Sequence, residues 1–301
     1  MINNSVKTEY SVALGFFDGL HRAHGTVLRS ALDAARLTGL TPAVLLFDEH
    51  PRTALTGDAV PSLLTREERD ERLRKMGFTL LFVSFKEIMN MSPEEFVCKI
   101  LCERYPAGAL SCGFNYNFGK NASGNTSLLR QLCAEREISL SVCPEFTLKG
   151  QTVSSTEIRR ALENGEIEKA NEMLGFPFGF TSPVFTGDQR GRLLGAPTIN
   201  QYIPEELIVP RFGVYASKVY FEGKEYVGVT NIGARPTFGQ GSVRSETYIV
   251  DFSGDLYGRE VRVEIHSFIR GEKKFPDADT LKAQIEADVI SAKKYFGGEA
   301  L

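Results

Sequence analysis

The sequence predicts an α/β domain built on a parallel sheet, followed by an antiparallel β domain that ends in a helix. Apolar segments typical of buried strands alternate with helix-patterned segments through the first half of the 301 residues. After Gly175-Phe176-Pro177 the pattern changes to short strands separated by glycine turns. We therefore expect two domains, one over residues 1–177 and one over 178–301.

The elements of the first domain follow from apolar runs and from signals at helix ends. The expected strands cover residues 10–14, 42–47, 78–83, 109–112 and 138–143. The expected helices cover residues 26–37, 66–76, 92–105, 154–165 and 167–174. Gly39 and Gly77 are typical helix caps, and Ser92-Pro93 with Glu95 is typical of a capping box.

The second domain shows strands of alternating polarity. They are expected at residues 178–186, 214–221, 224–230, 247–252 and 259–268. Glu222-Gly223 joins the second and third of them as a hairpin, and the even spacing indicates a barrel or a sandwich. A final helix is expected over residues 277–295, capped by Asp277 or Asp279.

Composition and charge exclude several classes of protein. The formal net charge is −3 without a block of lysine or arginine, so no nucleic-acid partner is expected. The first residues lack the pattern of a signal peptide, and no apolar run is long enough to cross a bilayer. The five cysteines form no CxxC pair, which favours reduced thiols and a cytoplasmic location.

The run from Gly15 to His24 joins an apolar strand to a helix through a glycine turn. Such a junction binds phosphate well, because the first amides of a helix are unpaired and its dipole favours anions. His21 and His24 are three residues apart and would share one face of the helix. An alternative is half of a zinc site, with His50 or Asp18 as a further ligand.

Two later segments are also typical of phosphate-binding sites. Residues 113–120 form a glycine-bounded loop after a strand and contain Asn115, and Ser154, Ser155 and Thr156 open a helix that carries Arg159 one turn in. Alone, the first is a turn and the second a capping box. In this order, together with the histidines, they indicate transfer of AMP from ATP, which needs charge stabilisation on phosphates.

The second half lacks GxxxxGK[ST], which excludes a Walker-type phosphate loop. It contains instead a glycine-rich segment from Gly187 to Asn200. Thr198 and Asn200 alternate on an extended chain, so their side chains would point the same way and could share one Mg²⁺. The alternative is a β-turn made rigid by Pro197.

These motifs make the chain resemble the bacterial bifunctional riboflavin kinase/FMN adenylyltransferases, also called FAD synthetases. The first family motif matches Gly15, Phe17, Asp18, Gly19, His21 and His24, and the SSTxIR motif is complete from Ser154 to Arg159. The riboflavin kinase motif matches Gly191, Arg192, Gly195, Pro197, Thr198 and Asn200. Ala23, Asn117, Ala196 and Tyr248 depart from the family pattern.

The resemblance implies a Rossmann-like nucleotidyltransferase domain and a riboflavin kinase-like barrel. In the first, His21, His24 and Arg159 would act on the phosphates of ATP. Its nucleotide- and flavin-binding residues would be Gly15, Phe17, Asp18, Gly19, Asn115, Ser154, Ser155 and Thr156. In the second, Glu246 would be the general base, and Thr198 with Asn200 would hold Mg²⁺. The remaining binding residues would be Gly187, Arg192, Gly195, Pro197, Asn231 and Arg270.

We therefore expect an enzyme that phosphorylates riboflavin to FMN and then joins AMP from ATP to FMN, giving FAD and pyrophosphate. Its partners would be these small molecules alone, and it would be a monomer or a weak homo-oligomer. Three alternatives stay open: loss of one activity, adenylyl transfer to another phosphorylated cofactor precursor, and a flavin-binding regulator without enzymatic activity.

Overall fold

The computed structural model describes residues 9–48, 53–54, 57–186, 198–234 and 243–297. The chain forms two compact units. The N-terminal unit comprises Met1–Val60 and Arg66–Ser154, and the C-terminal unit comprises Pro61–Thr65 and Ser155–Leu301. Among the described helices, none combines the length and the apolar character that crossing a membrane requires.

The N-terminal unit is built on a five-stranded parallel sheet with the order β3-β2-β1-β4-β5. Its strands are β1 (Tyr10–Leu14), β2 (Thr41–Phe47), β3 (Thr79–Val83), β4 (Ala107–Gly113) and β5 (Ser139–Cys143). The chain proceeds from β1 outward to β3 and then returns to the other side of β1. The strand order therefore reverses between β1 and β4, the point at which open α/β sheets bind ligands beyond their carboxyl ends.

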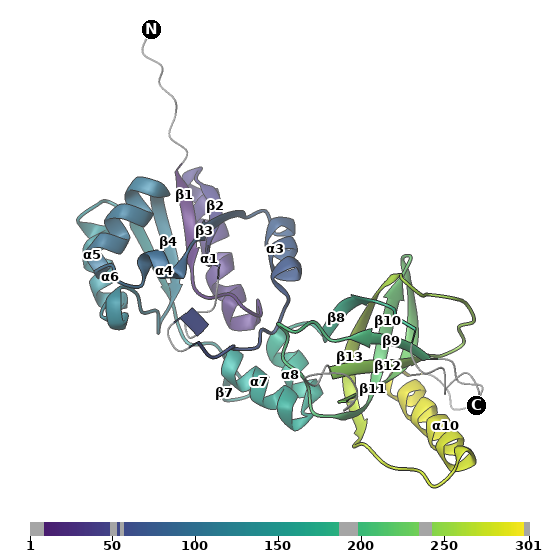
Figure 1. The fold of residues 1–301 in the computed structure, drawn as a ribbon. Helices are drawn as coiled ribbons and strands as arrows, with labels where there is room; N and C mark the ends of the chain where they lie inside the picture. The colour runs from purple at the N-terminus through teal and green to yellow at the C-terminus, as the bar shows by residue number, and fades with distance from the viewer. Residues whose placement is uncertain (1–8, 49–52, 55–56, 187–197, 235–242, 298–301) are drawn as a thin grey trace. The chain divides into compact units, whose positions relative to one another are not determined.

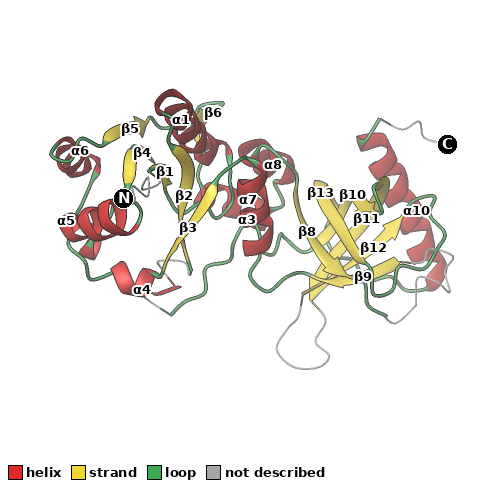
Figure 2. Cartoon of the chain, turned by 90° about the horizontal axis from the view of Figure 1, so that it is seen from above, coloured by secondary structure: helices red, strands yellow, loops and turns green. Residues whose placement is uncertain are grey.

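Helices cover both faces of this sheet (Figures 1 and 2). On one face, Leu28 of α1 (Arg22–Thr38) and Leu73 of α3 (Arg66–Lys75) belong to one buried core. A second core lies on the opposite face. Its helices are α4 (Phe85–Ile88), α5 (Pro93–Glu95), the π-helix η1 (Phe96–Arg104) and α6 (Thr126–Ala134). A short hairpin of β6 (Thr147–Leu148) and β7 (Gln151–Thr152) follows the sheet.

All five predicted strands of this unit are confirmed, with ends that differ by at most two residues. The first helix begins at Arg22 instead of residue 26, because the His21 side chain caps it. The capping box at Ser92 and Glu95 is confirmed, but the helix continues as a π-helix whose Tyr105 N–H bonds to the Ile100 carbonyl. The helix α6, capped by Asn125, was not predicted.

The C-terminal unit contains a six-stranded antiparallel sheet with the order β8-β13-β10-β11-β12-β9. Its strands are β8 (Phe178–Pro183), β9 (Thr198–Tyr202), β10 (Gly213–Phe221), β11 (Lys224–Ala234), β12 (Val243–Ile249) and β13 (Glu260–Arg270). The two edges meet, because the Phe185 N–H bonds to the Asn200 carbonyl at 2.9 Å and Ser182 donates to the Tyr202 carbonyl at 2.8 Å. The sheet thus closes into a barrel, which decides against a sandwich.

Among the described residues of this unit, three helices accompany the barrel. The terminal helix α10 (Ala278–Tyr295), drawn in yellow in Figure 1, packs on β10, β11 and β13, and Asp277 caps it. The helices α7 (Ser155–Asn164) and α8 (Ile167–Leu174) also belong to this unit. Asn171 joins α8 to the barrel, because it accepts from the Phe178 N–H and donates to the Ile265 carbonyl, both at 2.8 Å.

The barrel interior is partly polar. Hydroxyl groups of Ser217, Thr230 and Thr247 form a chain across β10, β11 and β12, with O···O distances of 2.7 and 2.9 Å. We call these three residues the hydroxyl chain, and all are fully buried. Gln201 on β9 is also buried and donates to the Ser182 and Val261 carbonyls.

This polar interior explains the errors in predicting the barrel. The strand β9 was not predicted, and β12 begins at Val243 instead of residue 247. Both strands place polar residues inside the barrel, Gln201 in β9 and Ser245 with Thr247 in β12. A strand with polar residues on both faces lacks the alternation of apolar and polar residues by which strands are recognised.

Candidate active sites

Two predicted motifs leave the N-terminal sheet side by side. Leu14, the last residue of β1, pairs with Cys112 of the neighbouring strand β4. The loops that begin at Gly15 and Gly113 therefore start next to each other, where the strand order reverses. This position suits a nucleotide, as sheets of this type bind ligands there.

His21 and His24 form a stacked pair at the start of α1. The His21 Nδ1 accepts a hydrogen bond from the His24 backbone N–H, with 3.2 Å between the nitrogens. Since an accepting nitrogen carries no proton, a neutral His21 ring has its proton on Nε2 and can donate it to an anion. The two rings lie 3.6 Å apart between centroids, at an angle of 14°. The shared face that the sequence predicts for the two histidines is confirmed.

His24 contributes no positive charge to the binding of an anion at this turn. Burial lowers the pKa of His24 to about 3, so the ring is neutral at neutral pH. Its Nδ1 is buried and makes no hydrogen bond to any residue that the structure describes. The attraction for an anion at this turn therefore comes from N–H donors and from the dipole of α1.

The turn before the histidines holds two non-glycine residues in the left-handed region, Phe17 with φ 46° and Leu20 with φ 44°. Phe17 is fully buried, and its ring fills the space that a Cβ on Gly15 would need, 3.0 Å away. Asp18 and Gly19 are buried in the same turn. Such backbone conformations cost about 1–3 kcal/mol each and persist where packing determines them. The shape of the loop is therefore set before any ligand arrives.

Asp18, His21 and His24 also come within reach of one cation. Each offers a ligand atom, and these atoms lie within 4.8 Å of one another. The geometry therefore allows the alternative of a zinc site with Asp18 as a further ligand. His50, the other ligand considered, lies outside the described residues. The stack favours phosphate, because nearly parallel rings direct their nitrogens in parallel and tetrahedral zinc needs them to converge.

The second loop presents Asn115 at an exposed position. Asn117 donates to the Asn115 carbonyl at 2.9 Å. Gly119, with φ 74°, lies so close to Pro93 that a Cβ would stand 2.8 Å from the Pro93 nitrogen. The Lys120 N–H bonds to the Met91 carbonyl at 2.7 Å. The loop is therefore anchored at its far end, and Asn115 lies at its exposed tip.

The Ser154–Arg159 motif lies at the start of α7. Ser155 and Thr156 occupy the first turn of this helix, and Ser154 precedes it. Arg159 donates its Nε proton to the Pro61 carbonyl at 2.7 Å. Ser155, Thr156 and Arg159 belong to the C-terminal unit, whereas the two histidines belong to the N-terminal unit.

In the barrel, strand register aligns predicted residues in one row. Asn200 on β9 pairs with Glu246 on β12, which pairs with Asn231 on β11. Such partners share one face of the sheet, with Cβ atoms about 5 Å apart. We call these three residues the polar row. The same line continues through Val214 on β10 to Arg270 on β13.

Thr198 lies on the same face as the polar row. It pairs with Tyr248, two residues after Glu246, while Asn200 pairs with Glu246 itself. Thr198 and Asn200 therefore project to one side of β9, as the sequence predicts. The other predicted residues of this segment, Gly187, Arg192, Gly195 and Pro197, lie outside the described residues.

Comparison with known proteins finds a match to each half of the chain. A family model described as FAD synthetase matches residues 3–157, and one described as riboflavin kinase matches residues 174–296. The bifunctional riboflavin kinase/FMN adenylyltransferase of Listeria monocytogenes is 35% identical over 290 residues, which are 95% of this chain and 92% of that protein. The chain belongs to this family.

Further members of the family are similar over the same length. The Bacillus subtilis enzyme is 35% identical over 292 residues, covering 95% of this chain and 92% of that protein. The Escherichia coli K12 enzyme is 33% identical with the same coverage of both. A solved structure described as a macrolide-efflux protein from Streptococcus pneumoniae has a TM-score of 0.87 and 29% identity, covering 95% of this chain and 94% of that one. The word efflux describes that protein and is not a property assigned to this chain.

Within the riboflavin kinase match, Arg270 is held by the terminal helix. Its Nε and Nη2 donate to the Asp288 carboxylate at 2.7 to 3.1 Å, and its Nη1 donates to the Gly271 carbonyl. Asp288 is 2% exposed and also accepts from Gln284. These bonds favour an anchoring role that fixes α10 to the barrel, and a direct contact of Arg270 with nucleotide or flavin stays a prediction.

Sequence reasoning missed Arg244, which precedes Glu246 by two residues on the same face of β12. Its guanidinium lies 5.3 Å from the ring centroid of Phe185 and 5.2 Å from that of Tyr202. It donates to the Tyr202 hydroxyl at 3.2 Å, and its buried Nε makes no hydrogen bond within the described residues. The spacing from Glu246 is the one signal that identifies it in the sequence.

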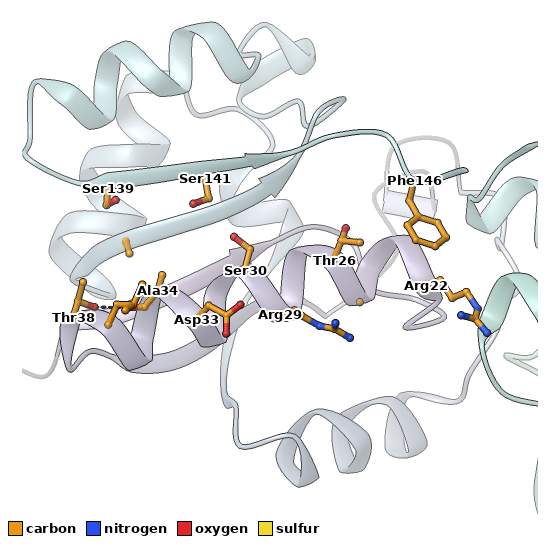
Figure 3. Close-up of a pocket in the computed structure, with 13 residues that line it drawn as sticks. Arg22, Thr26, Arg29, Ser30, Asp33, Ala34, Thr38, Ser139, Ser141 and Phe146 are labelled. Atoms are coloured by element: carbon orange, nitrogen blue, oxygen red, sulfur yellow. Dashed lines mark hydrogen bonds between the residues drawn. The ribbon is translucent and has the colours of Figure 1, made fainter. Parts of the chain in front are cut away.

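Sequence reasoning also missed a pocket of about 700 Å³ in the FAD synthetase match. Figure 3 shows it between α1 and the strand that carries Ser139 and Ser141. Two arginines and several hydroxyl groups line it: Arg22, Arg29, Thr26, Ser30, Ser139 and Ser141. The lining residues come from distant parts of the sequence, so no local sequence motif predicts the pocket. His21 and His24 are not among the described residues that line it.

Proposed function

We propose how the described residues divide the two activities of this family between the two parts of the chain. The chain is a riboflavin kinase and an FMN adenylyltransferase, since it matches both family models and full-length members. The proposal assigns adenylyl transfer to residues 1–177 and phosphorylation of riboflavin to residues 178–301. A cytoplasmic location and a monomeric or weakly associated state belong to the same proposal.

In the kinase half, Glu246 takes the proton from the terminal hydroxyl of riboflavin as that oxygen attacks the γ-phosphorus of ATP. FMN forms, and ADP leaves. A carboxylate within reach of a hydroxyl can orient and deprotonate it. The position of Glu246 supports this role, because it lies between Asn200 and Asn231, whose amides can hold phosphate or hydroxyl groups beside it.

Thr198 and Asn200 are the proposed holders of Mg²⁺. Both offer an oxygen on one face of β9, and neutral oxygen ligands suit this hard cation, which also keeps waters and nucleotide oxygens. When bound, the ion would neutralise charge on the phosphates of ATP. Asn200 is 8% exposed, so its amide lies at a site that is largely shielded from solvent.

In the adenylyltransferase half, FMN attacks the α-phosphorus of a second ATP, and pyrophosphate leaves. The His21 Nε2–H and the amides at the start of α1 would donate to the phosphates, with Arg159 supplying a positive charge. Gly15, Phe17, Asp18 and Gly19 would shape the turn. Asn115 would contact the substrate from the neighbouring loop.

The single observation that carries the kinase assignment is the alignment of the polar row by strand register. The test is to incubate the protein with riboflavin and Mg-ATP and to separate the flavins. Appearance of FMN followed by FAD supports both activities. FMN without FAD means that the adenylyltransferase half is inactive. The absence of both FMN and FAD contradicts the proposal.

The departures from the family pattern motivate one alternative, retention of a single activity. Ala23 adds a methyl group beside the histidine pair, and Asn117 replaces a common arginine. Tyr248 replaces a common histidine beside Thr198, and Ala196 lies outside the described residues. A second alternative, transfer of AMP to another cofactor precursor, predicts that FMN is not consumed when it is supplied with ATP.

A further inference from the structure

A carboxylate from outside the strands lies on the face of the barrel that carries the polar row. Gly233 on β11 has no side chain, and the Glu272 carboxylate occupies the space that one would fill. A Cβ on Gly233 would stand 2.3 Å from the Glu272 Oε1. The same point lies 4.0 Å from the Asn231 Nδ2. Glu272 therefore reaches back from the segment between β13 and α10 to the neighbourhood of Asn231.

The register shows where this carboxylate lies relative to Glu246. Gly233 follows Asn231 by two residues, so the vacant side of Gly233 and the Asn231 side chain face the same way. Asn231 pairs with Glu246. Two carboxylates, Glu246 and Glu272, thus lie on one face, Glu246 across the strand pair from Asn231 and Glu272 beside the next position along β11.

Two arginines on this face are directed to other groups, Arg270 to the Asp288 carboxylate and Arg244 to two aromatic rings. Arg244 is the register partner of Gly233, but its guanidinium lies over Phe185 and Tyr202, toward the β9 side of the barrel. Glu272 is exposed, and no described residue makes a hydrogen bond or an ion pair to it. Its carboxylate oxygens can accept hydrogen bonds from a ligand.

The substrate of the kinase half offers matching donors. Riboflavin carries its terminal hydroxyl on a polyol chain with several secondary hydroxyl groups. We propose that Glu272 is a positioning residue of the kinase site, whose carboxylate accepts hydrogen bonds from the secondary hydroxyls of that chain while Glu246 acts on the terminal one. This inference rests on the assignment of the kinase reaction to the face of Glu246. Glu272 itself forms and breaks no covalent bond.

Gly233 acquires a function in this arrangement. Alanine fits an ordinary strand conformation, and Gly233 does not adopt a positive φ. A methyl group there would nevertheless displace the Glu272 carboxylate, because the two would occupy the same space. Gly233 thus keeps the place of the carboxylate open.

The first test compares Glu272→Ala with the wild-type full-length protein in steady-state phosphorylation of riboflavin. We expect the KM for riboflavin to rise about tenfold or more, the scale of a lost hydrogen bond to a charged group, with kcat within about twofold. Glu272→Gln keeps the reach and one acceptor oxygen, so its KM should fall between the two. An unchanged KM for riboflavin in Glu272→Ala overturns the proposal.

The second test uses a flavin whose N10 chain is a straight hydroxyalkyl group with only the terminal hydroxyl. The wild type should phosphorylate it with a raised KM. Glu272→Ala should then cause no further rise, because the groups that Glu272 contacts are gone. An equal rise in KM for riboflavin and for this analogue means a general structural effect and contradicts the proposal.

The third test is Gly233→Ala, alone and combined with Glu272→Ala. The single variant should raise the KM for riboflavin as Glu272→Ala does, and the double variant should add nothing. Additive effects contradict the proposal. The matched control is Glu260→Gln, an exposed glutamate at the start of β13, which should change neither constant.

These outcomes separate the two assignments. If Glu246→Gln also leaves phosphorylation intact, the kinase assignment itself fails and Glu272 fails with it. If Glu246→Gln abolishes phosphorylation while Glu272→Ala leaves the KM for riboflavin unchanged, only the role of Glu272 is wrong. Formation of FAD from supplied FMN reports that the N-terminal unit is folded, and denaturant unfolding of the same samples reports whether the barrel unit is folded.

Discussion

The candidate sites of the two units present their polar groups in different ways. In the N-terminal unit, the candidate groups lie on loops and on one helix start, beyond the carboxyl ends of parallel strands β1 and β4. In the barrel, they lie on the strands themselves and are aligned by register across β9, β12 and β11. The first device offers backbone N–H groups and a helix dipole, and the second offers side-chain carboxylate and amide groups.

The difference determines what each site is sensitive to. A loop site depends on local turn shape, which Phe17 and Gly15 fix by packing. A site on paired strands depends on register, because a slip of one residue moves every side chain to the opposite face. The following predictions use each activity as the control for the other.

The largest effect is expected for Glu246→Gln. Loss of the general base should lower the rate of FMN formation by about 10³-fold, within the range of general base catalysis. FAD formation from supplied FMN should stay unchanged, and Glu260→Gln should leave both rates intact. Separation of the flavin products measures this, and a kinase rate that survives the substitution contradicts the assignment of the base.

Asp288→Ala should destabilise the barrel unit by about 3 kcal/mol, because it leaves the partly buried Arg270 guanidinium without its partner. The terminal helix should loosen, and FMN formation should fall with it. Denaturant unfolding, followed separately for each activity, measures the effect. Replacement of the exposed Asp279 by Ala is the control, and equal destabilisation by both variants would argue against the ion pair as the anchor.

His21→Ala should lower FAD formation from FMN by about 100-fold, the scale of losing one positioned donor to a developing charge. The substitution also removes the cap of α1. His21→Asn is therefore a useful second variant, because asparagine can cap the helix but lacks the Nε2 donor. FMN formation should not change. If Asn restores full activity, His21 serves only as a cap.

Thr247→Val should test the register of the polar row. The substitution keeps the shape of the side chain but leaves the Thr230 hydroxyl of the hydroxyl chain with one partner fewer, at a cost of about 1–2 kcal/mol. Unfolding of the barrel measures the cost, and the kinase rate reports whether Glu246 stays in place. An unchanged stability would mean that the hydroxyl chain does not support the strands.

The last prediction, similar in size to that for Thr247→Val, concerns the pH dependence of stability. The pKa of His24 is about 3 in the folded chain and near 6.5 when unfolded, so the unfolded state binds a proton first as the pH falls. The contribution of His24 is complete above pH 6.5 and is lost toward pH 3. In His24→Gln, the melting temperature should fall less between pH 7 and pH 5 than in the wild type. A parallel fall in both proteins would contradict a neutral His24.

The predictability of the fold differs between the two units for a physical reason. The parallel strands β1 to β5 are apolar where they enter the core, so hydropathy locates them within two residues. The barrel strands β9 and β12 carry buried polar residues such as Gln201, which donates to carbonyl groups, and Thr247, whose hydroxyl bonds to that of Thr230. Hydrogen-bond partners decide the burial of these residues, and a partner distant in sequence leaves no local pattern.

The same contrast applies to the candidate sites. The stacking of His21 on His24 and the shared face of Thr198 and Asn200 follow from helical and strand spacing. The roles of Glu246 and Asn231 rest on family resemblance, and register adds their pairing. Arg244 and Glu272 escaped sequence reasoning, because their places depend on contacts with Tyr202 and Gly233 from other strands.

The π-helix η1 affects how the chain tolerates a change in its length. Adding one residue to an α-helix rotates everything beyond it by about 100°, which would bring buried side chains into solvent. A wide turn absorbs such an extra residue locally, and Phe96, Val97, Ile100 and Leu101 all remain buried here. Phe96–Arg104 is thus a place where this chain can accommodate loss of a single amino acid, and a variant one residue shorter there would form an ordinary α-helix with the same residues buried.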